Sequence, residues 1–303
     1  MPPVSTDLLA WVVVAAFAAT ALVERYDADL ARRAGAGAWA LFAVFWLALV
    51  PHFAFEQMSI IEGVLSAAAV PASLYTGYLL YRGRTSLLVL TRSIAVMGAI
   101  YLPFTTLPWL AVPLVETTTR QVDWIVTQLG YAPTVTVGDA GMRNTFVFHT
   151  GGQIYRTSLV LACTGIGSIT IFVGLVAAVR APLDRKLRAL AVSAPVIWVL
   201  NLARNSFIAL AQGKQWFAGL YPDLVMTVFG ARSEHLVSFL WADRVVSQSL
   251  SVVALVFITW VVVREVPELS VIFEDVIFLA TGREYDLQRD LGIGARPDGG
   301  ERD

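Results

Sequence analysis

The sequence predicts an all-α protein that crosses a membrane about seven times. Of its 303 residues, 57% are hydrophobic and only 15% are charged, and the mean hydropathy is +0.66. A soluble domain of this length cannot bury so much apolar surface. The net charge of −1 excludes the basic surface that a nucleic-acid partner requires. A single cysteine excludes an internal disulfide and a cysteine-based zinc cluster, and we expect no metal or other cofactor.

Seven apolar segments are long enough to cross about 30 Å of hydrocarbon. They are Leu8–Val23, Ala38–Phe55, Ile60–Tyr81, Ser93–Val115, Leu159–Val179, Leu187–Leu210 and Val245–Val263. Prolines within the third and fourth predict kinks, and a break in the fourth would raise the count to eight. The first segment lacks a preceding basic region, so we expect an uncleaved span rather than a signal peptide.

Basic residues follow the odd-numbered spans. They are Arg25, Arg32 and Arg33 after the first, Arg82, Arg84 and Arg92 after the third, Arg180, Arg185, Lys186 and Arg188 after the fifth, and Arg264 after the seventh. The opposite loop Pro51–Ser59 has no Lys or Arg. Because cytoplasmic loops are enriched in Lys and Arg, we expect the N-terminus outside and the C-terminus in the cytoplasm.

This topology divides the chain into four parts. They are a four-span region 1–115, an extracytoplasmic loop 116–158, a three-span region 159–263 and a cytoplasmic tail 264–303. The loop contains two β-prone stretches, Thr145–His149 and Gln153–Tyr155, on either side of two glycines, which predicts a small hairpin. In the tail, we expect Val271–Leu279 to lie on the membrane surface and the polar, Gly-rich Gly292–Asp303 to be disordered.

Three chemically notable residues fall at one membrane depth in this topology. Cys163 is near the outer start of the fifth span, Arg204 is about two turns from the outer end of the sixth, and Arg244 opens the seventh. An arginine within a span costs about 2.5–3.5 kcal/mol on insertion scales, so it normally faces a polar cavity or a partner. The alternatives are a buried structural cysteine and arginines that snorkel to headgroups or clamp helices.

Small and polar residues surround these three. Asn201 and Asn205 share a helical face with Arg204, which predicts a polar stripe pointing into the bundle. Thr164 and Ser168, with the glycines between them, keep the helix end at Cys163 small enough for a substrate chain to approach. We therefore interpret all four as candidate substrate-binding residues.

A thiol at a helix N-terminus beside a permanent cation is in a setting that favours the thiolate. Arginine cannot act as a general base, so we expect Arg204 to stabilise the thiolate or an oxyanion. Asp243 can orient either arginine. A leaving group still needs a proton donor, and His235 in the outer loop is a candidate, with His149 and His52 as weaker ones.

The motifs Cys-Thr-Gly-Ile-Gly-Ser at 163–168 and Asn-Leu-Ala-Arg-Asn at 201–205, with Arg244 opening the last span, resemble the exosortase/archaeosortase family. The final segment Ala242–Gln248 is most similar to its archaeosortase branch. The resemblance implies that Cys163 is the nucleophile, Arg204 the second catalytic residue and Arg244 the third, with His235 as the competitor for that third place.

The resemblance also implies a function. Substrates of this family are surface-protein precursors, such as S-layer glycoproteins, with a C-terminal signal of a short motif such as Pro-Gly-Phe, a transmembrane helix and a basic cluster. We expect a multi-pass, archaeal membrane enzyme that cleaves this signal near the extracytoplasmic face through a Cys163 thioester and transfers the new C-terminus to a membrane lipid.

Two other functions remain open from the sequence. The first is a multi-pass transporter in which Arg204 binds an anionic solute, since intramembrane charges often mark transport pathways. The second is an enzyme acting on lipid-linked phosphates, with the arginines as phosphate ligands. That enzyme would need acidic metal ligands outside the membrane, and Asp139, Glu234 and Asp243 form no convincing cluster.

Overall fold

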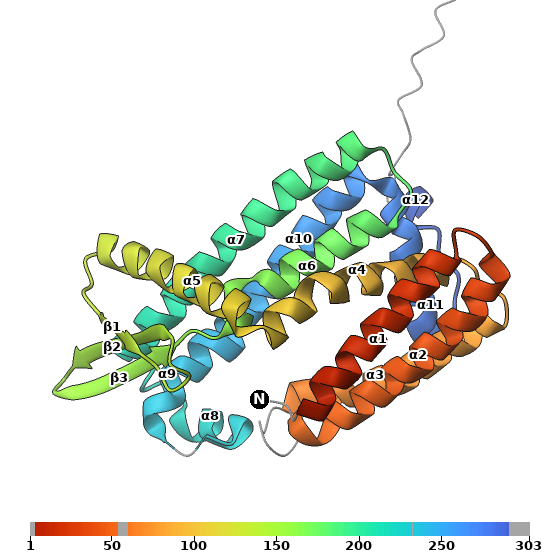
Figure 1. Cartoon of the computed structure of the whole chain (residues 1–303). Coiled ribbons are helices and arrows are strands. Elements are labelled where there is room, and N and C mark those ends of the chain that lie inside the picture. Colours follow the sequence, from red (N-terminus) through yellow and green to blue (C-terminus); the bar gives the residue numbers. More distant parts are fainter. Residues whose placement is uncertain (1–3, 54–59, 232, 291–303) are drawn as a thin grey trace, which may run out of the picture. The chain divides into compact units, whose positions relative to one another are not determined.

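The computed structural model of the protein describes residues 4–53, 60–231 and 233–290, which form two compact units. The first unit contains the residues up to Ile100, Ile171–Val192, and the residues from Thr259 onward. The second contains Tyr101–Thr170 and Ser193–Ile258. Figure 1 labels the elements, and helices α4, α6, α7 and α10 each contribute to both units.

Helices make up most of the structure. They are α1 (Val4–Val23), α2 (Ala28–Pro51), α3 (Ile60–Tyr81), α4 (Leu87–Thr106), α5 (Pro108–Gln128), α6 (Ile166–Ala178), α7 (Leu183–Lys214), α8 (Pro222–Phe229), α9 (Val237–Leu240), α10 (Gln248–Glu265), α11 (Ser270–Thr281) and α12 (Leu287–Asp290). Three strands, β1 (Thr134–Val137), β2 (Arg143–Thr150) and β3 (Gln153–Ser158), form one antiparallel sheet in that order. Short helical turns are η2 (Leu161–Thr164), η3 (Glu234–Leu236), η4 (Trp241–Ser247) and η5 (Pro267–Leu269).

Within the described residues, six helical stretches are long and apolar enough to span a membrane. They are Thr6–Val23, Ala28–Pro51, Gly63–Tyr81, Leu87–Thr106, Leu183–Lys214 and Glu234–Glu265, and α6 is a shorter apolar helix. The predicted polytopic all-α fold is therefore confirmed. The last stretch begins earlier than the predicted seventh span because η3, α9 and η4 continue into α10.

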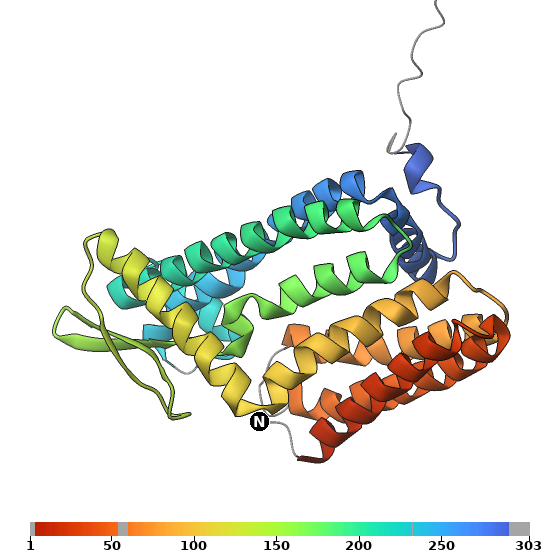
Figure 2. The same ribbon diagram turned by 45° about the horizontal axis from the view of Figure 1, so that its top comes forward.

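The predicted fourth span is broken, as its prolines allowed. Helix α4 ends at Thr106 and α5 begins with Pro108, at a bend that Figure 2 shows between amber and yellow helices. Helix α5 then continues to Gln128, so the first third of the expected loop 116–158 is helical. Its buried residues Val115, Val122 and Val126 recur at helical spacing among polar ones, a periodicity that average hydropathy does not detect.

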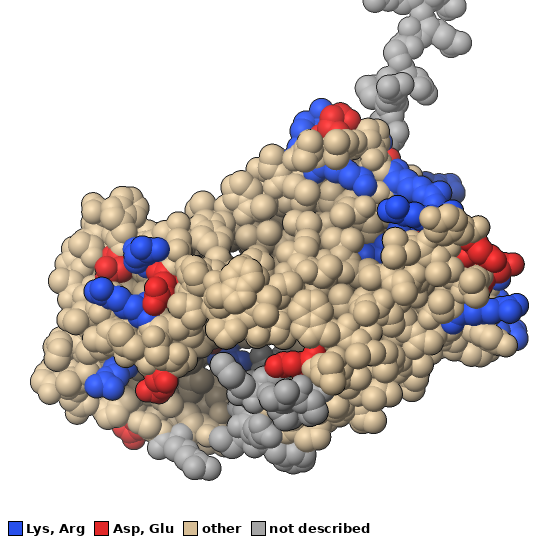
Figure 3. Space-filling view, in the orientation of Figure 1, with Lys and Arg blue, Asp and Glu red and all other residues tan. Residues whose placement is uncertain are grey.

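The first unit has a core between α1, α2, α3 and α4. Phe17 packs edge-on against Trp39 with ring centroids 5.3 Å apart, and the Trp39 indole donates a 3.0 Å hydrogen bond to the Thr91 hydroxyl. Gly77 permits α3 to approach α2, because a Cβ there would lie 3.0 Å from the Ala36 carbonyl oxygen. On the face drawn in Figure 3, the charged side chains of this unit gather at the helix ends.

The basic loops of the first unit are joined to one another. Arg32 donates to the Gly83 carbonyl at 3.3 Å, and Arg92 pairs with Glu24. Arg92 also donates to the Ala178 carbonyl at 3.0 Å. The loops after α1, α3 and α6 therefore meet at one end of this unit, as the alternation of basic loops predicted.

The apolar tail segment forms α11, which is fixed to the loop before α4. Arg84 binds the buried Asp275 carboxylate at 2.7 Å, and the Ser86 hydroxyl donates to the same oxygen at 3.0 Å. Arg84 also binds Glu284, and this hydrogen bond lowers the pKa of that carboxyl. The expected disorder of Gly292–Asp303 concerns residues outside those that the structure describes.

The second unit confirms the predicted hairpin and adds a strand. Gly151 and Gly152 have φ of +61° and +77°, as a two-residue turn between β2 and β3 requires. Strand β1, which the sequence did not indicate, pairs with β2. Figure 1 shows the sheet beside the C-terminal end of α7, where Thr150 donates to the Gly213 carbonyl at 2.7 Å. Gly213 leaves room for the ring of Phe148, which a Cβ would meet at 2.3 Å.

Candidate functional site

Cys163 lies in the second unit, in the 3₁₀ turn η2 that follows the sheet. The sheet fixes the entry to this turn, because Asn144 and Leu159 exchange two hydrogen bonds, of 2.6 and 2.8 Å. Leu159 is buried in a cluster with Phe146 and Phe148, and Cys163 packs against the same cluster. The thiol residue therefore sits four residues beyond a well-anchored point of the chain.

Gly165 separates η2 from α6. Its φ of +79° is in the left-handed region that favours glycine, and it ends the 3₁₀ turn before α6 begins at Ile166. The predicted fifth span, starting at Leu159, is corrected accordingly: Leu159–Gly165 is not part of the α-helix. A Cβ at position 165 would also lie 3.2 Å from the side chain of Asn201.

Two amides of α7 hold the backbone of Cys163. Asn201 Nδ2 donates to the Cys163 carbonyl oxygen at 2.5 Å, and Asn205 Nδ2 donates to the same oxygen at 2.6 Å. The predicted polar stripe therefore exists on one face of α7. Both asparagines, interpreted from the sequence as substrate-binding residues, bind the Cys163 backbone in this structure. Their amides therefore position the cysteine residue.

Asp243 joins the two arginines. Arg204 Nη2 binds Asp243 Oδ1 at 2.6 Å, while Arg244 Nε lies 3.6 Å from Asp243 Oδ2. Asp243 and Arg244 belong to η4, a π-helical turn, and such turns occur frequently at functional sites. The structure thus brings Arg204 and Arg244 together, but each of them faces a carboxylate rather than standing as an isolated cation.

Arg204 has a buried donor that remains available for a further partner. Its Nε atom is buried and has no hydrogen-bond acceptor among the residues described. Since Nη2 is held by Asp243, the guanidinium is fixed in orientation while Nε–H remains available. A buried, preoriented and unpaired donor is suited to an oxygen that gains negative charge during a reaction.

The other predicted residues have more ordinary surroundings. Thr164 is fully buried, and its hydroxyl donates to the Leu161 carbonyl at 2.7 Å within η2. Ser168 is partly exposed on the first turn of α6. The His235 ring packs edge-on against Tyr155 of β3, with centroids 5.7 Å apart, and His149 is exposed on β2.

The asparagine pair at positions 201 and 205 is the part of the site whose role the sequence did not reveal. Their i, i+4 spacing predicts a common face, but it does not identify what that face contacts. The backbone carbonyl that they bind belongs to a residue about forty positions earlier, and only the fold brings the two segments together.

Comparison with known proteins gives concordant matches. Residues 4–231 match the family model of the transmembrane exosortase, a range that includes Cys163 and Arg204 and ends before Asp243. Archaeosortase A of Haloferax volcanii is 50% identical over 303 residues, which cover 97% of this chain and all of that protein. Archaeosortase A of Natronomonas pharaonis is 47% identical over 279 residues, covering 90% of this chain and 88% of that protein. No solved structure matches the chain.

The family match covers well over half of the chain, and both relatives align over nearly its whole length. These matches agree with the polytopic fold and with the motifs around Cys163 and Arg204. The chain therefore belongs to the transmembrane exosortase family.

Proposed function

We propose that this protein is a membrane-embedded cysteine transpeptidase that cleaves the C-terminal sorting signal of surface-protein precursors and transfers the new C-terminus to a membrane lipid. The observation that carries the proposal is the double hydrogen bond from Asn201 and Asn205 to the Cys163 carbonyl. It fixes the protein's one thiol against the helix that carries Arg204. The two relatives named Archaeosortase A support the same class of reaction.

In the first step, the Cys163 sulfur attacks the carbonyl carbon of the scissile peptide bond. Arg204 Nε–H donates to the carbonyl oxygen as it becomes an oxyanion, and Asp243 keeps the guanidinium in place. The C–N bond then breaks, the thiol proton ends on the departing amine, and the precursor is left as a thioester on Cys163.

In the second step, an amine or hydroxyl of a lipid attacks the thioester. Its proton returns to the sulfur, which regenerates the thiol and leaves the precursor joined to the lipid. Arg204 supports this step through the same contact, because a second oxyanion forms at the same carbon. Arg244 shares Asp243 with Arg204, so we assign it as the third catalytic residue in preference to His235.

The proposed topology follows the basic loops. The end of the first unit where Arg32, Arg92 and their partners meet is cytoplasmic in this proposal, with the N-terminus outside and the C-terminus inside. The site then lies near the extracytoplasmic face, where a precursor anchored by a signal helix presents its cleavage motif.

The ion pair also distinguishes this function from anion transport. Arg204 already binds a carboxylate of the chain at 2.6 Å, so an anionic solute would have to displace Asp243 before binding there. A neutral peptide carbonyl needs only the free Nε–H donor.

The proposal is tested by complementing cells that lack the native enzyme and following a surface protein with a Pro-Gly-Phe motif, a helix and a basic cluster at its C-terminus. We expect Cys163→Ala to abolish processing and Arg204→Ala to slow it at least a hundredfold, because an oxyanion-stabilising group is worth about that much. We expect Arg244→Ala to slow processing less, because it removes only the second arginine that shares Asp243 with Arg204. We expect His235→Phe, which keeps a ring against Tyr155, to process normally.

Expression of each variant is checked by immunoblot of the membrane fraction. Normal processing by Cys163→Ala would refute the thiol mechanism and make anion transport the function to test. Loss in His235→Phe with normal processing in Arg244→Ala would assign the third catalytic place to the histidine.

The positioning role of the amides gives a second prediction. Asn205→Ala removes one hydrogen bond, worth about 1 kcal/mol, so we expect kcat to fall about fivefold. Asn205→Asp should lower kcat far more, since its carboxylate would face the Cys163 carbonyl oxygen. The matched control is Ser206→Ala, a buried neighbour whose hydroxyl bonds only within α7 among the described residues. Equal kcat values for both Asn205 variants and the control would contradict this role.

The Arg204–Asp243 pair gives a third prediction. Asp243→Asn removes a negative charge that offsets Arg204, so the thiolate fraction of Cys163 at neutral pH should rise. We expect iodoacetamide to alkylate the variant severalfold faster than the wild type at pH 7. Asp223→Asn, an exposed change on α8, serves as the control. A rate unchanged or lowered in Asp243→Asn would show that the carboxylate does not offset Arg204 at the thiol.

A further inference from the structure

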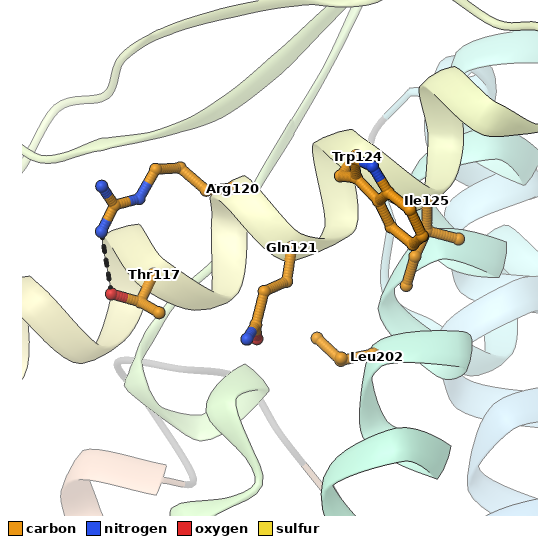
Figure 4. A pocket seen from close by; sticks show the side chains of 6 residues that line it. All are labelled: Thr117, Arg120, Gln121, Trp124, Ile125 and Leu202. Atoms are coloured by element: carbon orange, nitrogen blue, oxygen red, sulfur yellow. Dashed lines mark hydrogen bonds between the residues drawn. The ribbon is translucent and has the colours of Figure 1, made fainter.

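A groove of about 430 Å³ lies in the second unit between α5 and α7. It is lined by Thr117, Arg120, Gln121, Trp124 and Ile125 of α5 and by Leu202 of α7. Figure 4 shows Gln121 extending from α5 into the space beside Leu202, while Arg120 turns to bind the Thr117 hydroxyl at 3.0 Å. The Arg120 charge is therefore directed to its own helix.

The groove has one unmatched polar atom. Gln121 Oε1 is buried and accepts no hydrogen bond from any residue described. A buried acceptor without a donor is unfavourable, so a ligand that supplies an N–H or O–H would bind favourably there. The surrounding Trp124, Ile125 and Leu202 offer apolar surface for a neighbouring side chain.

The two walls of the groove also contact the elements around Cys163. Leu202 stands between Asn201 and Arg204 on α7, and it packs against the same buried cluster as Cys163. Helix α5, which forms the opposite wall, also contacts η2. The same two helices that line the groove therefore also hold the turn that presents the thiol.

We propose that this groove binds the peptide segment of the precursor beside the scissile bond, with Gln121 Oε1 accepting one of its backbone N–H groups and Trp124 contacting an apolar side chain. An extended peptide fits both features, because it offers a free N–H and a side chain at each residue. The inference rests on the proposed transpeptidase function and names the surface that recognises the substrate.

The test uses the full-length enzyme in detergent and a semisynthetic precursor fragment with the signal described above. Thioester formation on Cys163 and lipid transfer are measured separately. We expect Gln121→Leu to raise KM about tenfold with little change in kcat, and Gln121→Glu, which keeps the acceptor, to resemble the wild type. Gln128→Leu, at an exposed position of α5 outside the groove, is the matched control.

N-methylation of each backbone amide near the cleavage site then identifies the bonded N–H. At one position, methylation of the substrate should lower kcat/KM about tenfold for the wild type and leave kcat/KM of Gln121→Leu unchanged. Trp124→Ala should also raise KM, whereas Trp109→Ala, a similarly exposed tryptophan of α5 outside the groove, should not.

Each alternative gives a distinct result. Equal KM values for the Gln121 variants and the control, with methylation equally costly in both enzymes, would overturn the groove assignment and leave the transpeptidase intact. Normal thioester formation with slowed transfer in Gln121→Leu would show that the groove binds the lipid acceptor instead. If the wild type forms no thioester at all while processing the fragment, the proposed function itself fails.

Discussion

The site depends on one backbone carbonyl. The oxygen of Cys163 accepts hydrogen bonds from two side chains one helical turn apart, Asn201 and Asn205, which uses both of its lone pairs. Because Arg204 lies between these positions on the same helix, the contact sets the thiol residue and the guanidinium relative to each other. It also dictates Gly165, since any side chain there would crowd Asn201. The sheet packs on α7, and Asn144 holds Leu159 at the end of the sheet. These contacts position η2, which carries Cys163, against α7.

The second organising element is the carboxylate of Asp243. A lone buried arginine near a thiol would favour the thiolate, whereas the charge of an arginine paired with Asp243 is partly compensated. In the proposed mechanism, the ion pair lowers the activation of the thiol but fixes the guanidinium, whose buried Nε–H has no partner among the described residues. The π-helical turn that places Asp243 and Arg244 together presents a wider helical turn at this point than an α-helix would. In the proposed mechanism, a substrate carbonyl that binds Arg204 is also the carbonyl that the Cys163 sulfur attacks.

Much of this arrangement could be predicted from the sequence, for identifiable reasons. Hydropathy predicts the spans because a helix must be long and apolar enough to cross the hydrocarbon, and basic residues mark the loops at one end of those spans. The two glycines at 151 and 152 predict the hairpin. Hydropathy places Leu159–Gly165 in a membrane-spanning helix because most of these residues are apolar. Gly165, however, adopts a left-handed conformation that ends the turn before α6. Average hydropathy does not predict the second half of α5, because only one of its faces is apolar. The carbonyl that Asn201 and Asn205 bind could not be predicted, because every residue has a backbone carbonyl and the sequence does not tell which one these amides contact.

In the proposed mechanism, Cys163 becomes acylated in the site built by these contacts. Because it is the only cysteine in the chain, a thioester can form at one position alone. The most direct measurement is mass spectrometry of the enzyme after acid quench during turnover with the precursor fragment. We expect an adduct on the Cys163 peptide with the mass of the precursor's N-terminal product, and we expect neutral hydroxylamine to remove it. Turnover without any adduct on Cys163, together with cleavage by Cys163→Ala, would contradict this mechanism.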